Sequence, residues 1–341
     1  MNAETHAYNG LPGPRTGSPP RAPGSVRRTT SLDVTRPDGP DGPIHVWGRA
    51  RDLLTGVDGS SRVLEHGLVH IVVEDGVVTY LTTAPVRSAA ARLVGRQALV
   101  GWRSALWREL RDDVEGGSAL HLVLDDLPGG MIVGGFTRRR ALAQLAAGPV
   151  KHPGRRLDVC AGWATGSRAA RHLDTHGYGP RAVTPAAPTL VPPEDPIAWH
   201  TLPDLPIWGL SRRRRIDVRP LPADPAAGAP SGSPAVQVDA MFRDSFRDGD
   251  GHEKVLHEYG ITTTLDGTGA VQAASADPRV LPHLECPVAA ASATHLAGMP
   301  SADLRDRVSL TLYGPGSCTH LNDLARSLAD VPVLLRAYQN A

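Results

Sequence analysis

The sequence contains few aromatic residues, almost no lysine and almost no net charge. Aromatic side chains make up 4% of the 341 residues, so the stacking platforms on which single-stranded nucleic acids bind are scarce. The formal net charge of +1 also lacks the basic surplus of proteins that bind a phosphate backbone. Lysine occurs only at Lys151 and Lys254, so arginine carries nearly all of the positive charge. We therefore expect no nucleic-acid partner.

Long apolar runs and cysteines are also rare. No stretch of about 18 apolar residues is present, so we expect no membrane-spanning helix. The N-terminus lacks the apolar core of a secretory signal, and we expect a cytoplasmic location. The three cysteines, Cys160, Cys286 and Cys318, are too few and odd in number for a disulfide framework. We expect them to be free or metal-bound in a reducing compartment.

One order of motifs occurs twice along the chain. Each copy has an apolar-Asp-Val segment, an Arg-Asp pair, a histidine nine residues before an Asp-Gly turn, and a second histidine after a Gly-Ser pair. The first copy contains Leu32-Asp33-Val34, Arg51-Asp52, His66, Asp75-Gly76 and His121. The second contains Ile216-Asp217-Val218, Arg243-Asp244, His257, Asp266-Gly267 and His320. A period this long indicates duplication of a whole domain rather than a solenoid.

The repeated order predicts the domain organisation. We expect an α+β fold of two similar repeats, each an antiparallel sheet with helices packed on one face, forming a pseudo-dimer within the chain. The expected parts are a disordered tail at 1–26, a degenerate repeat at 27–147, a linker at 148–211 and a second repeat at 212–341. Because the first repeat keeps His66 and His121 but no cysteine in those motifs, we place the functional site in the second.

Local patterns place strands first and helices last in each repeat. Segments rich in β-branched residues predict strands at 32–35, 45–50, 68–73, 77–81, 236–242, 258–265 and 270–276. The Asp75-Gly76 pair predicts a tight hairpin turn. Apolar spacing predicts helices at 86–110, 137–146, 286–296, 301–310 and 319–338. The run Arg212 to Arg215 is more typical of a solvated face than of a phosphate site.

Four side chains of the second repeat suit a metal ion. They are His257, Cys286, Cys318 and His320, all at the ends of predicted elements, where side chains from different elements converge. Two thiolates and two imidazoles match the ligand preference of zinc. Asp323, one turn after His320, is placed to accept a proton from that imidazole or to cap the helix. A metal-free Cys/His nucleophile and a purely structural role remain alternatives.

The same residues define the expected function. We expect an enzyme acting on a small organic molecule, with Cys286, Cys318 and His320 binding zinc or a similar ion. His257 would be the fourth ligand or the general base, and an open coordination position would support hydrolase, lyase or isomerase chemistry. The catalytic residues would be His257, Cys318 and Asp323. The alternative is a non-catalytic carrier of sulfur or iron, or a ligand-binding protein with a structural Cys/His site. The sequence does not indicate whether the chain forms homo-oligomers.

Other candidates carry weaker signals. Cys160 lies in the linker, and we interpret it as mainly structural. His172 and His176 are more typical of a surface pair on one helix face than of a ligand pair. His283 and His295 flank Cys286 and would be near a metal bound there.

The Cys286-Pro287 pair and the sequence Cys318-Thr319-His320-Leu321 together resemble a bacterial domain-of-unknown-function family with Cys-Pro and Gly-Cys-Thr-His-Leu motifs. The resemblance covers about residues 212–335, and more loosely the whole chain in a longer two-copy form. Ser317 stands where the short members usually have glycine. The resemblance implies which residues matter but no reaction. A more distant likeness is to the iron–sulfur scaffold and sulfur-acceptor fold, which also places strands before helices that begin with cysteines.

Overall fold

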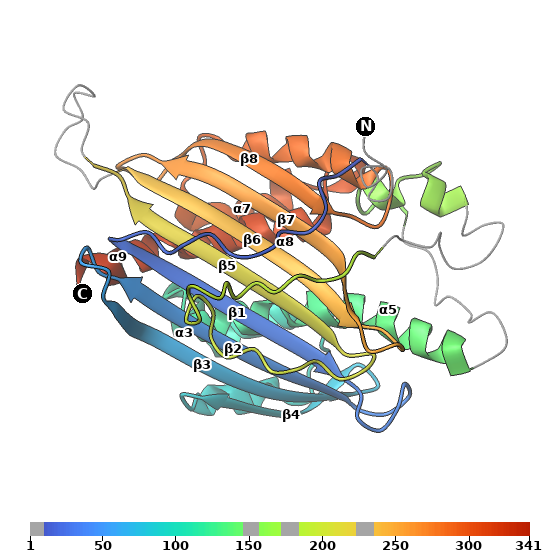
Figure 1. Ribbon diagram of the computed structural model, residues 1–341. Coiled ribbons are helices and arrows are strands. Elements are labelled where there is room, and N and C mark those ends of the chain that lie inside the picture. Colours follow the sequence, from blue (N-terminus) through green and yellow to red (C-terminus); the bar gives the residue numbers. More distant parts are fainter. Residues whose placement is uncertain (1–9, 146–156, 172–183, 223–234) are drawn as a thin grey trace.

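Eight antiparallel strands form one continuous sheet in the order β4-β3-β2-β1-β5-β6-β7-β8 (Figure 1). The computed structural model describes residues 10–145, 157–171, 184–222 and 235–341. The strands are β1 (Ser25–Thr35), β2 (Ile44–Thr55), β3 (Ser61–Glu74), β4 (Val77–Ala84), β5 (Leu210–Pro220), β6 (Val236–Arg247), β7 (Glu253–Leu265) and β8 (Val271–Val280). The expected mixture of helices with an antiparallel sheet is confirmed.

The middle of the sheet joins two distant parts of the chain. β1 pairs antiparallel with β5 from Val26 opposite Val218 to Val34 opposite Leu210, and Thr30 lies opposite Arg214 at the centre. β1 to β4 and β5 to β8 therefore extend outward in opposite directions from this pair. We call residues 10–145 the first half and residues 210–341 the second half. Each half contributes four neighbouring strands of one sheet.

Helices follow the strands in each half and cover one face of the sheet (Figure 1). The first half has η1 (Ser88–Leu93), α2 (Trp102–Glu109), α3 (Arg111–Glu115), α4 (Ala119–Asp125) and α5 (Leu127–Leu145). The second half has η3 (Cys286–Leu296), η4 (Ser301–Asp303), α7 (Leu304–Thr311), η5 (Gly314–Gly316), α8 (Thr319–Ser327), η6 (Leu328–Asp330) and α9 (Val331–Gln339). α4 packs against β2 and β3, whereas α9 packs against β1 and β5. Apolar residues between these layers form two cores, one largely from each half.

The helix predicted at 86–110 is wrong in its middle. The chain forms only η1 and α2 there, separated by a turn. Gly95 (φ 84°) and Gly101 (φ 75°) adopt left-handed backbone conformations, which end one helix and precede the next. The apolar spacing still identifies buried positions, because Leu93, Trp102 and Leu106 are all in the core.

Extended segments cross the face of the sheet opposite the helices (Figure 1). The N-terminal segment from residue 10 and the segment 184–209 meet where Ser18 N–H donates to the Leu190 carbonyl at 3.2 Å. Trp199 Nε1 donates to Ser18 Oγ at 2.7 Å, and both groups are buried. Residues 10–24 were expected within a disordered tail and 184–209 within a linker, but both are held against the sheet. Arg15 N–H donates to Glu258 of β7, and Leu190 and Trp199 pack with Met241 of β6.

The run Arg212 to Arg215 does not form the solvated face that its composition suggests. It lies inside β5, and alternation along the strand directs Arg212 and Arg214 to the helices and Arg213 and Arg215 to the opposite face. All four are buried. Carboxylates neutralise each of them, for example Asp244 at Arg212, Asp126 at Arg214 and Glu253 at Arg213. Tertiary partners thus override the composition of the segment.

Within the described residues, we find no helix with the length and apolar character needed to span a bilayer.

Candidate functional site

The candidate site begins where β6 and β7 pair beside a β-bulge. Asp244 lies directly opposite His257, and the pairing register shifts between Asp244 and Ser245. A bulge places two residues of one strand opposite one of its partner, which redirects the side chains beside it. Asp244 and His257 thus both point to the helix face, where His257 Nδ1 lies 3.1 Å from Asp244 Oδ2.

Arg212 holds Asp244 from the neighbouring strand. Its Nε and Nη2 atoms donate to the two carboxylate oxygens of Asp244 at 2.8 and 3.0 Å. Both side chains are buried, with exposed fractions of 1% and 0%. Burial alone would raise the pKa of Asp244, but the positive charge of Arg212 and the hydrogen bond from His257 outweigh it, so this pKa lies well below its usual range. Asp244 is therefore a fixed negative charge in the interior.

His320 completes the group from the first turn of α8. Its ring stacks on that of His257 with 3.8 Å between centroids, and its Nε2 lies 3.8 Å from Asp244 Oδ2. Burial, followed by the proximity of His257, lowers the pKa of His320 to about 3. His320 is therefore a neutral imidazole with lone-pair capacity near neutral pH.

Asp244, His257 and His320 are the one set in the described parts of the chain whose ligand atoms lie close enough to hold a metal ion. One ligand atom from each lies within 4.8 Å of the others. The structure therefore brings together two of the four predicted ligands, His257 and His320, and adds Asp244. Asp244 was not among the ligands predicted from the sequence. No local pattern identifies it, because the arginine that holds Asp244 is Arg212 of the neighbouring strand, whereas its sequence neighbour Arg243 bonds Glu258.

The two predicted cysteine ligands lie apart from this group. Cys318 Sγ is 3.9 Å from His320 Nδ1, on the side of the ring away from Asp244. Burial raises the pKa of the Cys318 thiol to about 11. Burial, reinforced by the Cys318 thiolate, also places the pKa of Cys286 well above its usual range. Both are protonated thiols at neutral pH, although each begins or precedes a helix.

Asp323 lies one turn after His320, but its carboxylate serves arginines. Oδ1 accepts from Arg103 at 2.8 Å, and Oδ2 accepts from Arg212 at 3.2 Å. Among the described residues, Asp323 has no hydrogen bond to His320. Its contacts therefore do not support the predicted role of orienting His320. Arg103 lies on α2 of the first half, and Asp323 therefore ties the two halves together beside the site.

The first half repeats this geometry with different side chains. Arg28 Nε and Nη2 donate to Asp52 at 2.7 Å each, and the register shifts directly after Asp52. Glu65 lies opposite Asp52, whereas His66 lies opposite Arg51. The expected correspondence of His66 with His257 is therefore wrong by one residue, because Glu-His in β3 replaces His-Glu in β7.

His121 and the other described candidates also lack the metal geometry. His121 Nδ1 faces Arg305 Nη1 at 3.2 Å. Burial and then Arg305 lower its pKa to about 4. Two other candidates, His172 and His176, lie outside the described residues. His295 is at the end of η3, and His283 lies beside Cys286 and Trp163.

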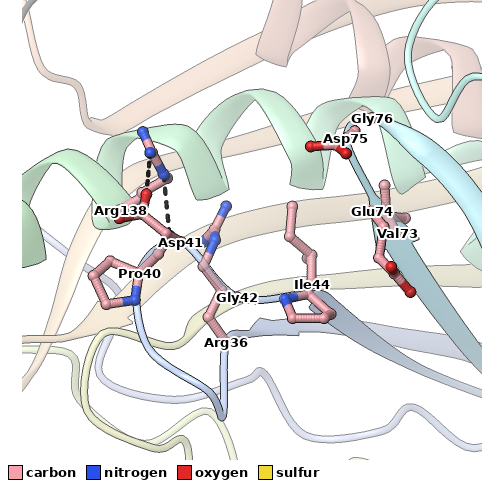
Figure 2. Close-up of a pocket in the computed structure, with 11 residues that line it drawn as sticks. Arg36, Pro40, Asp41, Gly42, Ile44, Val73, Glu74, Asp75, Gly76 and Arg138 are labelled. Atoms are coloured by element: carbon pink, nitrogen blue, oxygen red, sulfur yellow. Dashed lines mark hydrogen bonds and ion pairs between the residues drawn. The ribbon is translucent and has the colours of Figure 1, made fainter.

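One of two described hollows is lined by residues of the first half (Figure 2). Its volume is about 480 Å³, and its charged lining comes from Arg36, Asp41, Glu74, Asp75 and Arg138. Arg138 bonds the Pro40 carbonyl at 3.0 Å and also the carboxylate of Asp41. No residue of the Asp244 group lines either hollow, so the group is a buried site.

The fold and the site define an α+β chain with a buried Asp-His-His group in its second half. Residues 212–334 match a family model described as a protein of unknown function (DUF2889). The match begins at Arg212 and includes Asp244, His257, His320 and the two cysteines of the second half. No curated protein and no solved structure matched the chain. The second half thus resembles an uncharacterised domain family, and no reaction comes with that resemblance.

Proposed function

We propose that the chain is an enzyme that acts on a small organic molecule through a divalent transition metal, such as zinc, held by Asp244, His257 and His320. The observation that supports this proposal is the spacing of their ligand atoms within 4.8 Å. Two imidazoles and one carboxylate are a donor set that occurs in catalytic zinc and non-haem iron sites. Such a set leaves coordination positions open, which suits hydrolase, lyase or isomerase chemistry.

The surrounding residues support the ligands. Arg212 fixes both oxygens of Asp244 and is itself held by Asp323 at 3.2 Å. The Phe242 ring lies nearly parallel to the His320 ring, with 6.0 Å between centroids and 5° between planes. Residues that contact metal ligands in this way fix the orientation of those ligands, and the affinity of the site for the metal depends on them.

A metal-free acid–base site is the second candidate. The 3.1 Å contact between His257 Nδ1 and Asp244 Oδ2 has the geometry of a hydrogen bond in which Asp244 selects the Nδ1–H tautomer. His257 Nε2 would then be the proton acceptor. Arg212 already occupies both oxygens of Asp244, which favours this candidate. A metal ion bound through His257 Nδ1 would displace this proton, so the state of that atom separates the two candidates.

The two halves also fit an origin by duplication, in which they form a pseudo-dimer within the chain. An offset of 184 residues relates Arg28 to Arg212, and the β1–β5 pairing places Arg28 opposite Ile216 and Arg212 opposite Leu32. Such pairing is what a two-fold axis through Thr30 and Arg214 produces. On this proposal, the first half keeps the Arg-Asp pair and has Glu65 where the second half has His257.

Metal content tests the function. Full-length protein purified without chelators is incubated with Zn²⁺, desalted and measured by plasma mass spectrometry, with one tightly held zinc expected at this group. His257→Asn and His320→Asn should each retain about one zinc per chain fewer than the wild type. His121→Asn is the matched control, since it changes a buried imidazole at the start of α4 and should retain zinc.

Equal zinc content in all three variants would contradict the metal proposal. Asp244→Asn is avoided because it leaves Arg212 with one fewer buried countercharge. If wild-type protein retains no metal, nitrogen NMR of His257 distinguishes the second candidate, for which the Nδ1–H tautomer is expected. Bound labile iron or a persulfide would instead favour the non-catalytic carrier.

A further inference from the structure

The three cysteines of the chain gather around one tyrosine although up to 158 residues separate them (318 minus 160). Cys160 directly precedes η2 (Ala161–Trp163), Cys286 is the first residue of η3, and Cys318 directly precedes α8. All three thiols are free and buried. Each therefore lies at the beginning of a short helix, where backbone N–H groups are available.

The segment that carries Cys160 is docked on the other two. Ala161 N–H donates to the Ser317 carbonyl at 2.9 Å, next to Cys318. Gly162 packs so closely on Cys286 that a Cβ atom at this position would lie 2.6 Å from its Sγ and 3.0 Å from Cδ2 of His283. Residues 157–164 thus close over the helix starts of the second half, and Cys160 is not an isolated linker cysteine.

Tyr259 of β7 is buried beside the start of η3. Its hydroxyl donates to the Cys286 carbonyl at 3.3 Å. Burial, and then the nearby Cys318, Cys286 and Cys160 thiolates, raise the pKa of Tyr259. The Tyr259 hydroxyl therefore belongs to the same buried region as the cysteines.

Backbone donors face this cluster, and a buried imidazole lies beside it. The N–H groups of Gly162 and Trp163 face Cys160, and those of His320 and Leu321 face Cys318. Donors of this kind stabilise a thiolate. His283 Nδ1 is buried and has no hydrogen-bond partner among the described residues. The rings of His283 and Trp163 are arranged edge to face, with 5.1 Å between their centroids. A buried imidazole nitrogen without a partner is costly unless something binds it.

We infer that Cys160, Cys286 and Cys318 form a second metal site, with His283 as the fourth ligand, for a thiophilic divalent ion such as Zn²⁺. Three thiolates and one imidazole are a common closed tetrahedral zinc set. It shares no ligand with the Asp244 group, although Cys318 lies beside His320. The thiol sulfurs do not meet the spacing that the Asp244 group meets in the described chain, so binding requires the thiols to rotate toward one another. Each thiol that binds releases one proton to the buffer.

Cobalt spectroscopy tests this site separately from the first. Full-length protein is reduced with a phosphine, freed of metal and titrated anaerobically with Co²⁺. Thiolate ligation should produce sulfur-to-cobalt charge-transfer absorption in the near ultraviolet, which Asp and His ligands do not give. Zn²⁺ should then displace Co²⁺ and abolish the absorption. Proton release of about three per metal is expected in weak buffer.

Variants assign the ligands. Cys160→Ser should weaken Zn²⁺ binding at the thiol site by at least about tenfold and reduce the charge-transfer absorption. His257→Asn is the control, because it removes a ligand of the Asp244 group whose described contacts are with Asp244 and His320 rather than with a thiol. That variant should keep the cobalt absorption even if the first proposal fails.

Alkylation keeps the test decisive if Cys160→Ser does not fold. Zn²⁺ should slow the modification of Cys160, Cys286 and Cys318 by iodoacetamide in wild-type protein, as read by peptide mass spectrometry. The inference is overturned if wild-type protein shows no charge-transfer absorption. It is equally overturned if folded Cys160→Ser retains the full absorption, or if Zn²⁺ protects none of the three thiols.

Discussion

Arg28 Nη1 lies 2.8 Å from Asp330 Oδ2, and both side chains are fully buried. Arg28 is in the first strand of the sheet, and Asp330 directly precedes the last helix. The reverse pairing is also present, because Asp126 precedes α5 of the first half and accepts from Arg212 at 3.5 Å and from Arg214 at 2.6 Å. Each half thus supplies a carboxylate to an arginine in the first strand of the other.

Asp330→Ala should strongly destabilise the chain. Arg28 and Arg305 both bond this carboxylate, and its removal leaves buried positive charge uncompensated, at a cost of about 3 to 5 kcal/mol. Urea denaturation measures the change in unfolding free energy. The control is Asp303→Ala, whose pair with Arg307 is exposed, and it should change stability by about 0.5 kcal/mol or less. Equal effects of the two substitutions would contradict the importance of the buried pair.

Gly129→Ala should disturb the candidate site from the first half. A Cβ atom at Gly129 on α5 would lie 2.0 Å from Nη1 of Arg212, which holds Asp244. We expect a loss of about 1 to 3 kcal/mol in stability, together with weaker Zn²⁺ retention. Gly135→Ala in the same helix is the control, because its new Cβ would meet nothing closer than 3.4 Å. It should be neutral or stabilising, and unchanged zinc retention in Gly129→Ala would argue against the role of Arg212.

His200 should make the protein less stable in acid. It belongs to the segment 184–209 and faces β1, where Thr29 Oγ1 and Ser31 Oγ contact its two ring nitrogens at 2.9 and 2.8 Å. Burial, followed by Arg51, lowers the pKa of His200 to about 3. An unfolded histidine has a pKa of about 6.5. Between these values the unfolded chain binds a proton that the folded chain does not, so stability falls as pH falls.

The size of this effect is about 1.4 kcal/mol per pH unit for one group within that window. Unfolding free energies of wild type and His200→Asn at pH 7 and pH 5 measure it. Other buried histidines contribute equally to both proteins, so the difference in slope belongs to His200. Parallel slopes for the two proteins would show that His200 is not held neutral.

Gly162→Ala should destabilise the thiol cluster. The added methyl would overlap Cys286 Sγ and crowd the ring of His283, at an expected cost of about 1 to 3 kcal/mol. Gly316→Ala is a nearby control, since a Cβ at that position meets no atom within 4 Å. Thermal melting of both variants under reducing conditions measures the difference. A stable Gly162→Ala protein would mean that the segment 157–164 docks loosely.

Local sequence signals predicted much of the sheet. The β-branched runs and the Asp75-Gly76 turn identified the hairpin of β3 and β4, where Asp75 and Gly76 both have positive φ values. The arginine run was misjudged because a strand that is buried on both faces can hold arginine when carboxylates from distant segments surround it. The sequence around these arginines does not show which distant residues contact them. No local pattern therefore reveals that Asp126 and Asp244 lie beside them.

The candidate site was predictable only in part for the same reason. His257 and His320 were predicted as ligands because histidine commonly binds metals, and their rings stack in the structure. Asp244 became a candidate only through strand pairing, because Asp-His contact depends on the register of β6 and β7 and on the bulge. Cys160 was interpreted as structural because its place in the sequence gives no sign that it lies near Cys286 and Cys318. That proximity depends on how the segment 157–164 docks.

The ladder between β1 and β5 has a consequence for synthesis on the ribosome. The first four strands leave the ribosome with the inner edge of β1 unpaired, and Arg28 cannot contact Asp330 until the second half has been synthesised. A nascent first half therefore exposes an unpaired strand edge until β5 pairs with it. Stalled or truncated products should recruit chaperones or aggregate rather than accumulate as a folded fragment.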